Sequence, residues 1–194
     1  MKKLIFATGN PYKVKEVHKM LGGEFEVASL KDIGCEEDIP ETSPTIEGNA
    51  LQKARYVYEK YGLDCFSEDT GLEVKSLNGE PGVRSARYNG EVKDSEGNLQ
   101  LVLEKLKGQA DRSARFKTVI ALILDGKEHT FEGIAEGQIR HEKSGTGGFG
   151  YDPIFQPDGF PVTFAEMSDA EKNAISHRGK AVSQLVDFLK KQPD

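Results

Sequence analysis

The sequence predicts an α/β fold built on a mixed β-sheet, and two observations lead to this class. Apolar segments of strand length alternate along the chain with segments in which apolar residues recur every three or four positions, as they do in amphipathic helices. Two long apolar segments are also joined by Asp125-Gly126, a dipeptide typical of a tight antiparallel hairpin. Alternating strands and helices with an added hairpin indicate a sheet with both parallel and antiparallel neighbours, flanked by helices.

The elements follow in order. We expect a buried strand at 2–8, a helix from Pro11 to about Leu21, a strand at 25–30, an acidic loop at 31–44 and a helix at 45–62. Residues 63–74 predict a strand, an acidic turn and a second strand, and 81–90 predict a loop. An amphipathic helix at 95–108 precedes the hairpin at 115–139. Ser168 and Glu171 have the spacing of a capping box for a short helix, and Ser176 can cap the last helix, whose apolar face holds Val182, Leu185, Val186 and Leu189.

Composition narrows the class of protein. The 194 residues, 37% hydrophobic and 30% charged, contain no repeat or linker, so we expect one domain over 1–194. The net charge of -6 argues against a nucleic-acid partner, and no apolar stretch has the length of a secretory signal or a membrane span. Cys35 and Cys65 lack metal-ligand or redox spacing, which favours reduced thiols in the cytoplasm.

Two predicted helices begin with cations, where the helix dipole favours anions. Asn10 is a good N-cap and Pro11 fits the first helical position, yet Lys13 and Lys15 follow within the first turns. The last helix repeats this pattern with His177 and Arg178. Such positions can be ordinary surface variation, but helix N-termini also bind phosphate through free N–H groups. Two of them in an acidic protein predict a local site for a polyanion.

Acidic residues supply the matching metal ligands. Glu68 and Asp69 lie at a predicted strand end, and Glu41 lies in the preceding acidic loop. Carboxylate oxygens suit Mg²⁺, and a carboxylate near bound magnesium can orient or deprotonate the water that attacks phosphorus. The alternative is that Glu68 and Asp69 only form a solvated turn.

A glycine loop at 145–150 matches G-x-G-x-x-G, but it is not followed by a helix because Pro153 comes too soon. The dinucleotide-binding interpretation therefore fails, and no P-loop motif is present. The loop is better suited to presenting Phe149 and Tyr151 to a flat ligand. Alternatively, it is a plain surface turn beside core aromatics.

Five segments together resemble the inosine triphosphate pyrophosphatase family. They are TGNPYK, EDTGLEV, PGVRSARY, FGYDPIF and AEKNAISHR, in this order from residue 8 to residue 178. The resemblance implies an elongated mixed sheet with two lobes and a nucleotide cleft between them. It also implies Mg²⁺-dependent hydrolysis of ITP, dITP and XTP to the monophosphate and pyrophosphate by a cytoplasmic homodimer.

The resemblance also assigns site residues by position. Asp69 corresponds to the metal ligand and proton acceptor, and Glu41 to a second metal ligand. The implied substrate-binding residues are Thr8, Gly9, Asn10, Pro11, Tyr12, Lys13, Lys53, Thr70, Phe149, Gly150, Tyr151, Asp152, Lys172, His177 and Arg178. Among them, Lys172, His177 and Arg178 correspond to residues that read the 6-oxo edge of the purine.

The chain departs from the family pattern near Glu41, where Pro44 and Gly48 replace the more usual glycine and glutamate. Thr70 stands where serine is common and keeps the hydroxyl. Two other functions stay open: a nucleotide sensor without catalysis, and a hydrolase of pyrimidine or modified nucleotides. Glu68 and Asp69 beside the predicted phosphate site favour an enzyme, because a sensor needs no base.

Overall fold

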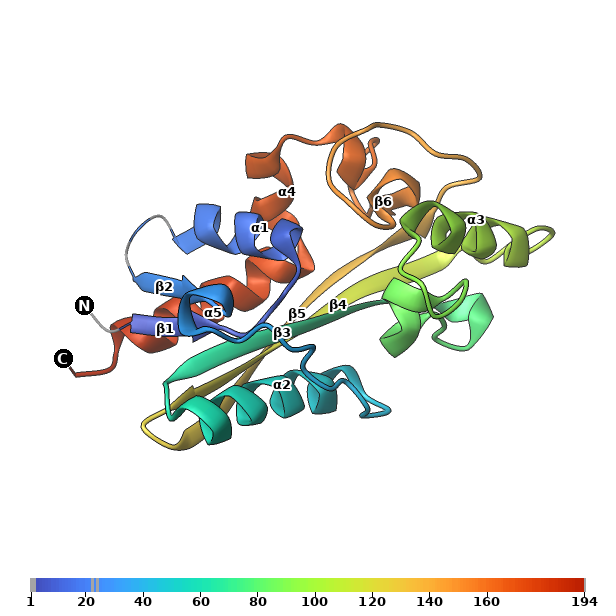
Figure 1. Ribbon diagram of the computed structural model, residues 1–194. Coiled ribbons are helices and arrows are strands. Elements are labelled where there is room, and N and C mark those ends of the chain that lie inside the picture. Colours follow the sequence, from blue (N-terminus) through green and yellow to red (C-terminus); the bar gives the residue numbers. More distant parts are fainter. Residues whose placement is uncertain (1–2, 22, 24, 194) are drawn as a thin grey trace. The chain divides into compact units, whose positions relative to one another are not determined.

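The computed structural model describes residues 3–21, 23 and 25–193 and contains the expected alternation of strands and helices (Figure 1). The strands are β1 (Lys3–Phe6), β2 (Glu26–Ser29), β3 (Cys65–Val74), β4 (Ser113–Leu124), β5 (Lys127–Ile139) and β6 (Phe155–Pro157). The α-helices are α1 (Pro11–Leu21), α2 (Ile46–Tyr61), α3 (Ser95–Lys105), α4 (Asp169–Ile175) and α5 (His177–Lys190). Short 3-10 helices are η1 (Lys31–Ile33), η2 (Lys75–Leu77), η3 (Gly82–Arg87), η4 (Asp152–Ile154) and η5 (Phe164–Glu166).

The strands form a six-stranded mixed sheet in the order β2-β1-β3-β4-β5-β6. β1 is parallel to both β2 and β3, with Ile5 opposite Cys65 and Phe6 opposite Phe66. β5 is antiparallel to β6. The predicted α/β class with a mixed sheet is therefore confirmed. The nucleotide cleft stays a prediction.

The chain divides into two compact units. Unit 1 comprises Met1–Asp69, Thr118–Gly133 and Arg178–Asp194, and unit 2 comprises Thr70–Lys117 and Ile134–His177. The long strands β3, β4 and β5 each contribute residues to both units.

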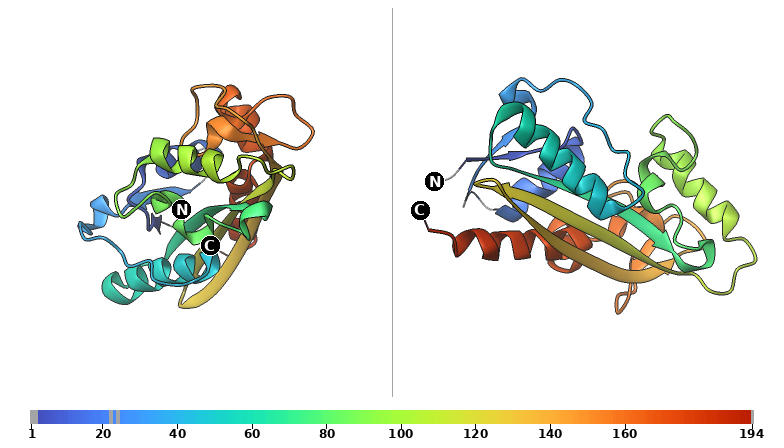
Figure 2. Two further views of the ribbon diagram at one scale, coloured as in Figure 1. Left: turned by 90° about the vertical axis from the view of Figure 1, so that its right-hand side faces the viewer. Right: turned by 90° about the horizontal axis from the view of Figure 1, so that it is seen from below.

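Unit 1 has helices on both faces of its strands (Figure 2). Successive β4 side chains point to opposite faces, as strand geometry requires. Val119, Ala121 and Ile123 pack with Ala50, Ala54 and Val57 of α2. Ile120, Leu122 and Leu124 instead pack with Val17 and Leu21 of α1 and with Ala181, Val182 and Leu185 of α5. Because β4 is buried on both faces, it has the continuous apolar sequence VIALIL.

Unit 2 has a separate core that is rich in aromatic residues. Phe116 of β4 packs against Phe155 and Phe164, with ring centroids 4.6 and 6.0 Å apart. Leu99, Val102 and Leu106 bring α3 into the same cluster. The apolar face predicted for α3 is therefore confirmed.

Short-range contacts fix the helix ends and the hairpin turn. Thr45 caps α2 by accepting a hydrogen bond from the Gly48 amide at 3.0 Å, and Gly62 ends this helix in the left-handed region at φ 65°. Ser168 and Glu171 form the predicted capping box of α4. Asp125 and Gly126 have φ angles of 50° and 77° and join β4 to β5, which confirms the hairpin.

Two expectations were wrong. Residues 63–74 do not contain an acidic turn, because Glu68 and Asp69 lie inside the single strand β3. Gly71 also lies within β3 and does not interrupt the strand. The 81–90 segment is also not plain loop, since Gly82–Arg87 forms η3.

Cys35 and Cys65 are both free and buried. No helix of the described chain is long and apolar enough to cross a membrane.

Candidate active site

The turn between β1 and α1 is held by its own side chains. Asn10 Oδ1 accepts hydrogen bonds from the amides of Tyr12 and Lys13 at 3.0 and 3.4 Å, so Asn10 is the N-cap as predicted. The Asn10 amide in turn donates to Thr8 Oγ1 at 3.1 Å. Pro11 begins the helix and has no amide hydrogen. The first amides of α1 are therefore already capped, contrary to the expectation of free N–H groups at this helix start.

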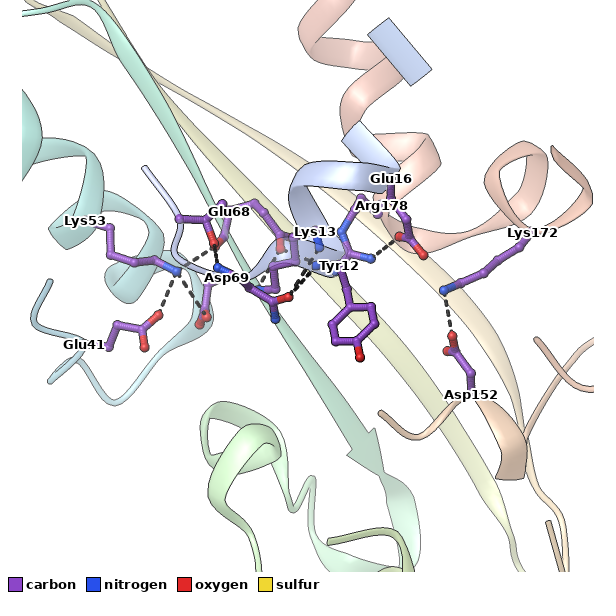
Figure 3. A network of polar contacts seen from close by, with 12 residues as sticks. Tyr12, Lys13, Glu16, Glu41, Lys53, Glu68, Asp69, Asp152, Lys172 and Arg178 are labelled. Carbon is purple, nitrogen blue, oxygen red and sulfur yellow. Dashed lines mark hydrogen bonds and ion pairs between the residues drawn. The ribbon is translucent and has the colours of Figure 1, made fainter. Parts of the chain in front are cut away.

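Lys13 and Arg178 bind the same buried carboxylate (Figure 3). Lys13 Nζ lies 2.7 Å from Glu68 Oε1, and Arg178 Nη2 lies 3.4 Å from it. Arg178 Nη1 also lies 2.5 Å from Glu16 Oε2. The Glu68 side chain is 0% exposed and that of Arg178 is 1% exposed. Lys13 and Arg178, one cation from each of the two helix starts, thus have internal anionic partners.

Burial and charge act in opposite directions on these two cations. Burial lowers the pKa of Lys13, although the nearby Glu68 carboxylate opposes that change. Burial also acts to lower the pKa of Arg178, but Glu68 and Glu16 outweigh it and raise that pKa. Arg178 therefore carries a fixed positive charge that is already shared between two carboxylates.

A second ion cluster forms around Lys53 of α2 (Figure 3). Lys53 Nζ lies 2.7 Å from Glu41 Oε1 and 3.8 Å from Asp69 Oδ1, and it donates to the Glu68 carbonyl at 2.7 Å. Burial acts to lower the pKa of Lys53, but the Asp69 and Glu41 carboxylates outweigh it and raise that pKa. Glu41 and Asp69 therefore converge on one positive charge.

The Asp69 carboxylate binds its proton more tightly than an ordinary aspartate does. Burial raises the pKa of Asp69 from 3.8 to about 6, and the charges of Lys53 and Lys13 limit the rise. A general base is most effective when its pKa lies near the working pH. β1 ends at Phe6, opposite Phe66, so Asp69 lies on the part of β3 beyond the carboxyl end of its parallel neighbour. Ligands bind at such strand ends in open α/β sheets.

The carboxylates suit a cation that arrives with a phosphate. Within the described residues, no three His, Cys, Asp or Glu side chains gather closely enough to hold a metal ion by themselves. Mg²⁺, however, is commonly bound through one or two carboxylates together with substrate phosphates. Glu41 and Asp69, converging on the Lys53 ammonium, fit that donor set. Glu68 does not, because its carboxylate is fully buried and binds Lys13 and Arg178.

Unit 2 contains its own group of predicted site residues. Asp152 Oδ2 lies 2.7 Å from Lys172 Nζ and accepts from the Phe149 amide at 3.0 Å. The Lys172 ammonium lies 4.9 Å from the centre of the Phe149 ring, within cation–π range. Asp152 and Lys172 are each only 3% exposed. Lys172 is therefore a buried and paired cation rather than an ordinary surface lysine.

The other predicted residues of unit 2 differ in their surroundings. His177 is buried and stacks on Phe116, with ring centroids 4.5 Å apart. Tyr151 lies in the core, and its hydroxyl donates to the Ser85 carbonyl at 2.6 Å, as a core aromatic would. Thr70 and Gly150 are partly exposed. The substrate-binding roles of these residues stay predictions.

Sequence reasoning missed Glu16, which binds Arg178 from the second turn of α1. Glu16 lies three residues after Lys13, so both point from neighbouring positions of one helix face. Nothing in the local sequence around Glu16 distinguishes it from an ordinary surface acid. Only the burial of Arg178 shows why an anion is needed there.

Comparisons with known proteins agree along the whole chain. Residues 4–188 match the Ham1 family. The chain is 57% identical to the dITP/XTP pyrophosphatase of Flavobacterium johnsoniae, over 96% of this chain and 97% of that protein. It is 54% identical to the dITP/XTP pyrophosphatase of Porphyromonas gingivalis, over 97% of this chain and 98% of the relative.

Solved structures of Ham1 proteins are also similar to this chain over nearly its whole length. A HAM1 protein from Coxiella burnetii matches with a TM-score of 0.91 and 38% identity, over 99% of this chain and 100% of that one. The Staphylococcus aureus Ham1 protein matches with a TM-score of 0.89 and 36% identity, over 97% of this chain and 98% of that one.

Proposed function

The chain belongs to the Ham1 family, and from this premise we propose that it hydrolyses the non-standard purine nucleoside triphosphates dITP, XTP and ITP. The products are the nucleoside monophosphate and pyrophosphate. The observation that carries the proposal is the position of Asp69, a carboxylate with a raised pKa beside the cations Lys13 and Lys53. Relatives named dITP/XTP pyrophosphatase support the substrate class.

In the proposed reaction, the oxygen of a water molecule attacks the α-phosphorus while Asp69 accepts a proton from that water. A new P–O bond forms, the bond from the α-phosphorus to the bridging oxygen breaks, and pyrophosphate leaves with the bond electrons. Lys53 and Lys13 provide positive charge where negative charge develops, which is the main way that proteins stabilise such a transition state.

We further propose that Glu41 and Asp69 hold Mg²⁺ when the substrate is bound. Mg²⁺ would supply charge neutralisation on the phosphate oxygens and lower the pKa of a bound water. The convergence of both carboxylates on Lys53 supports this assignment. Thr8 to Lys13 is the proposed triphosphate segment, with Lys13 as its cation.

Lys172, His177 and Arg178 are the proposed readers of the purine 6-oxo group. Lys172 and Arg178 have only hydrogen-bond donors, which match an acceptor oxygen at position 6 and mismatch the adenine amino group. We also propose that the protein is cytoplasmic, which the two buried free cysteines support. We propose that it forms a homodimer, and this assignment is based on the family resemblance alone.

The test is pyrophosphate release from a panel of nucleoside triphosphates in the presence of Mg²⁺. We expect release from dITP, XTP and ITP and much slower release from ATP, CTP and UTP. The Asp69→Asn variant is the control for contaminating hydrolases. Binding of dITP without release would indicate a sensor, and preferential release from pyrimidine nucleotides would contradict the proposed base specificity.

A further inference from the structure

The loop between η1 and α2 carries Glu41, and its polar contacts run along one face of α2. The Ser43 amide donates to Asn49 Oδ1 at 2.8 Å, and the Thr42 amide donates to Gln52 Oε1 at 2.8 Å. Gln52 Nε2 returns a hydrogen bond to Thr42 Oγ1 at 3.0 Å. The closer a loop residue lies to the start of the loop, the farther along α2 its partner lies.

The same order continues past Glu41. Glu41 itself pairs with Lys53 at 2.7 Å. Farther back, Glu37 Oε1 accepts from the Tyr56 hydroxyl at 2.9 Å and pairs closely with Lys60. The Tyr61 hydroxyl also donates to this oxygen at 3.3 Å. Hydrogen bonding from Lys60 lowers the pKa of Glu37 to about 2, so its charge persists at all working pH values.

These contacts come from one stripe of α2. Gln52, Lys53, Tyr56 and Lys60 follow Asn49 by 3, 4, 7 and 11 residues, the spacings that place side chains on one helix face. The loop has no regular secondary structure between Cys35 and Ser43. Its conformation is therefore set by side chains of α2 on both sides of Glu41.

Gly48 allows the loop to approach the first turn of α2. A Cβ atom at this position would lie 1.9 Å from Ser43 Oγ and 2.8 Å from Ser43 Cβ. A larger residue would therefore push Ser43 away from the helix. Gly48 thus permits the close contact of loop and helix in this chain.

We propose that Gln52 and Glu37 are positioning residues that fix the Glu41 carboxylate for the divalent cation. Gln52 holds the loop backbone next to Glu41 through the Thr42 amide, and Glu37 holds the start of the loop against Tyr56 and Lys60. This inference rests on the proposed function, because it assumes that Glu41 is a metal ligand. Partners that hydrogen-bond directly to a metal ligand commonly change metal affinity by 10–100-fold when they are replaced, so residues that act through the loop should have an effect at the lower end of this range.

The test compares Gln52→Ala and Glu37→Ala with the matched control Arg55→Gln. Arg55 lies on the same helix, and its exposed ion pair with Glu128, at 2.6 and 2.8 Å, does not involve the loop. Mn²⁺ accepts the same oxygen ligands as Mg²⁺, so its binding is measured from the EPR signal of free Mn²⁺ with pyrophosphate present. A protein-free sample with the same pyrophosphate corrects for Mn²⁺ that pyrophosphate chelates by itself. Thermal melts in a chelator report the stability of each variant.

We expect the Kd for Mn²⁺ to rise about tenfold in Gln52→Ala and Glu37→Ala and to stay unchanged in Arg55→Gln. The Mg²⁺ concentration for half-maximal pyrophosphate release should rise in parallel, while KM for dITP at saturating Mg²⁺ changes little. If the loop contacts were merely structural, the melting temperature would fall without a change in Mn²⁺ affinity. That result, with an active unmodified enzyme, overturns the inference, whereas an inactive unmodified enzyme overturns the proposed function.

Discussion

Lys13 Nζ lies 2.7 Å from Glu68 Oε1, and the carboxylate of this pair is completely buried. The pair explains how a cation is tolerated in the first turn of α1, where the helix dipole opposes it. The compensating anion comes from β3 rather than from a ligand. A phosphate group that binds Lys13 must therefore share this cation with Glu68.

Lys13→Ala should destabilise the protein without ligand. The change removes one of the two cations beside buried Glu68, but Arg178 remains, so we expect less than the ~3–5 kcal/mol typical of breaking a buried pair. Relief of the helix dipole returns only about 0.3–1 kcal/mol. Thermal melts with and without dITP measure both effects, and an unchanged or higher melting temperature without ligand would show that the Lys13–Glu68 pair contributes little.

Asp69→Asn should nearly abolish turnover and yet stabilise the folded protein at neutral pH. Loss of a general base alone typically costs ~10²–10⁴ in rate. The folded state keeps the Asp69 proton up to about pH 6, whereas an unfolded Asp loses it near 3.8, so folding stability falls as pH rises through this window. Asn does not ionise, so the variant keeps this part of the free energy of unfolding, which is up to about 3 kcal/mol for a pKa shift of this size.

The measurement is the free energy of unfolding of both proteins between pH 4 and pH 8 in a chelator. The advantage of Asn should grow between about pH 4 and 6 and then level off. A constant difference at all pH values would mean that Asp69 ionises normally.

Gly148→Ala should be more harmful than Gly150→Ala. Both glycines have left-handed backbones, with φ of 65° and 60°, and replacing either costs roughly 1–2 kcal/mol for that reason. At Gly148, however, the new Cβ would also lie 2.1 Å from Asp152 Oδ2, whereas at Gly150 no atom lies within 4 Å. We expect a larger fall in melting temperature and a larger rise in KM for dITP in Gly148→Ala. Equal effects would mean that the Asp152–Lys172 pair adapts without loss.

Arg178→Ala should reduce the preference for ITP over ATP. The guanidinium is held by Glu16 and Glu68 and has only donors to offer, so it can gain a hydrogen bond from a 6-oxo base but not from the amino group of adenine. Mismatches of this kind can supply a discrimination of roughly 10²-fold or more. The variant will also lose stability because Glu16 and Glu68 lose their shared partner. The ratio of kcat/KM for ITP to kcat/KM for ATP is measured within each protein, so it does not depend on the folded fraction. An unchanged ratio would assign the base reading to other residues.

Local patterns were sufficient to predict most of the fold. The Asp125-Gly126 hairpin, the capping box of Ser168 and Glu171, and the apolar face of α5 depend on neighbours within a few residues, and all are present. The continuity of β3 could not be predicted in this way. Gly71 normally weakens a strand, but here pairing along the sheet outweighs the local preference.

In the candidate site, too, short-range features could be predicted and long-range contacts could not. Asn10 as a cap follows from local spacing, whereas the partners of Arg178 lie 162 and 110 residues away in sequence. Such long-range pairs leave no periodic signal in a single sequence. The residues themselves were predicted mainly from a family resemblance, and the charge relationships among them came only from the fold.

The composition of unit 1 has a consequence for synthesis of the chain. Unit 2 contains no residue after His177, but the core of unit 1 includes Ala181, Val182 and Leu185 of α5. Domains usually fold in the order in which the ribosome releases them, beginning with the N-terminal one. Here the unit that contains the first strand is completed last. Until α5 has emerged, the apolar faces of β1 and α1 that it covers stay open to chaperones and to other nascent chains.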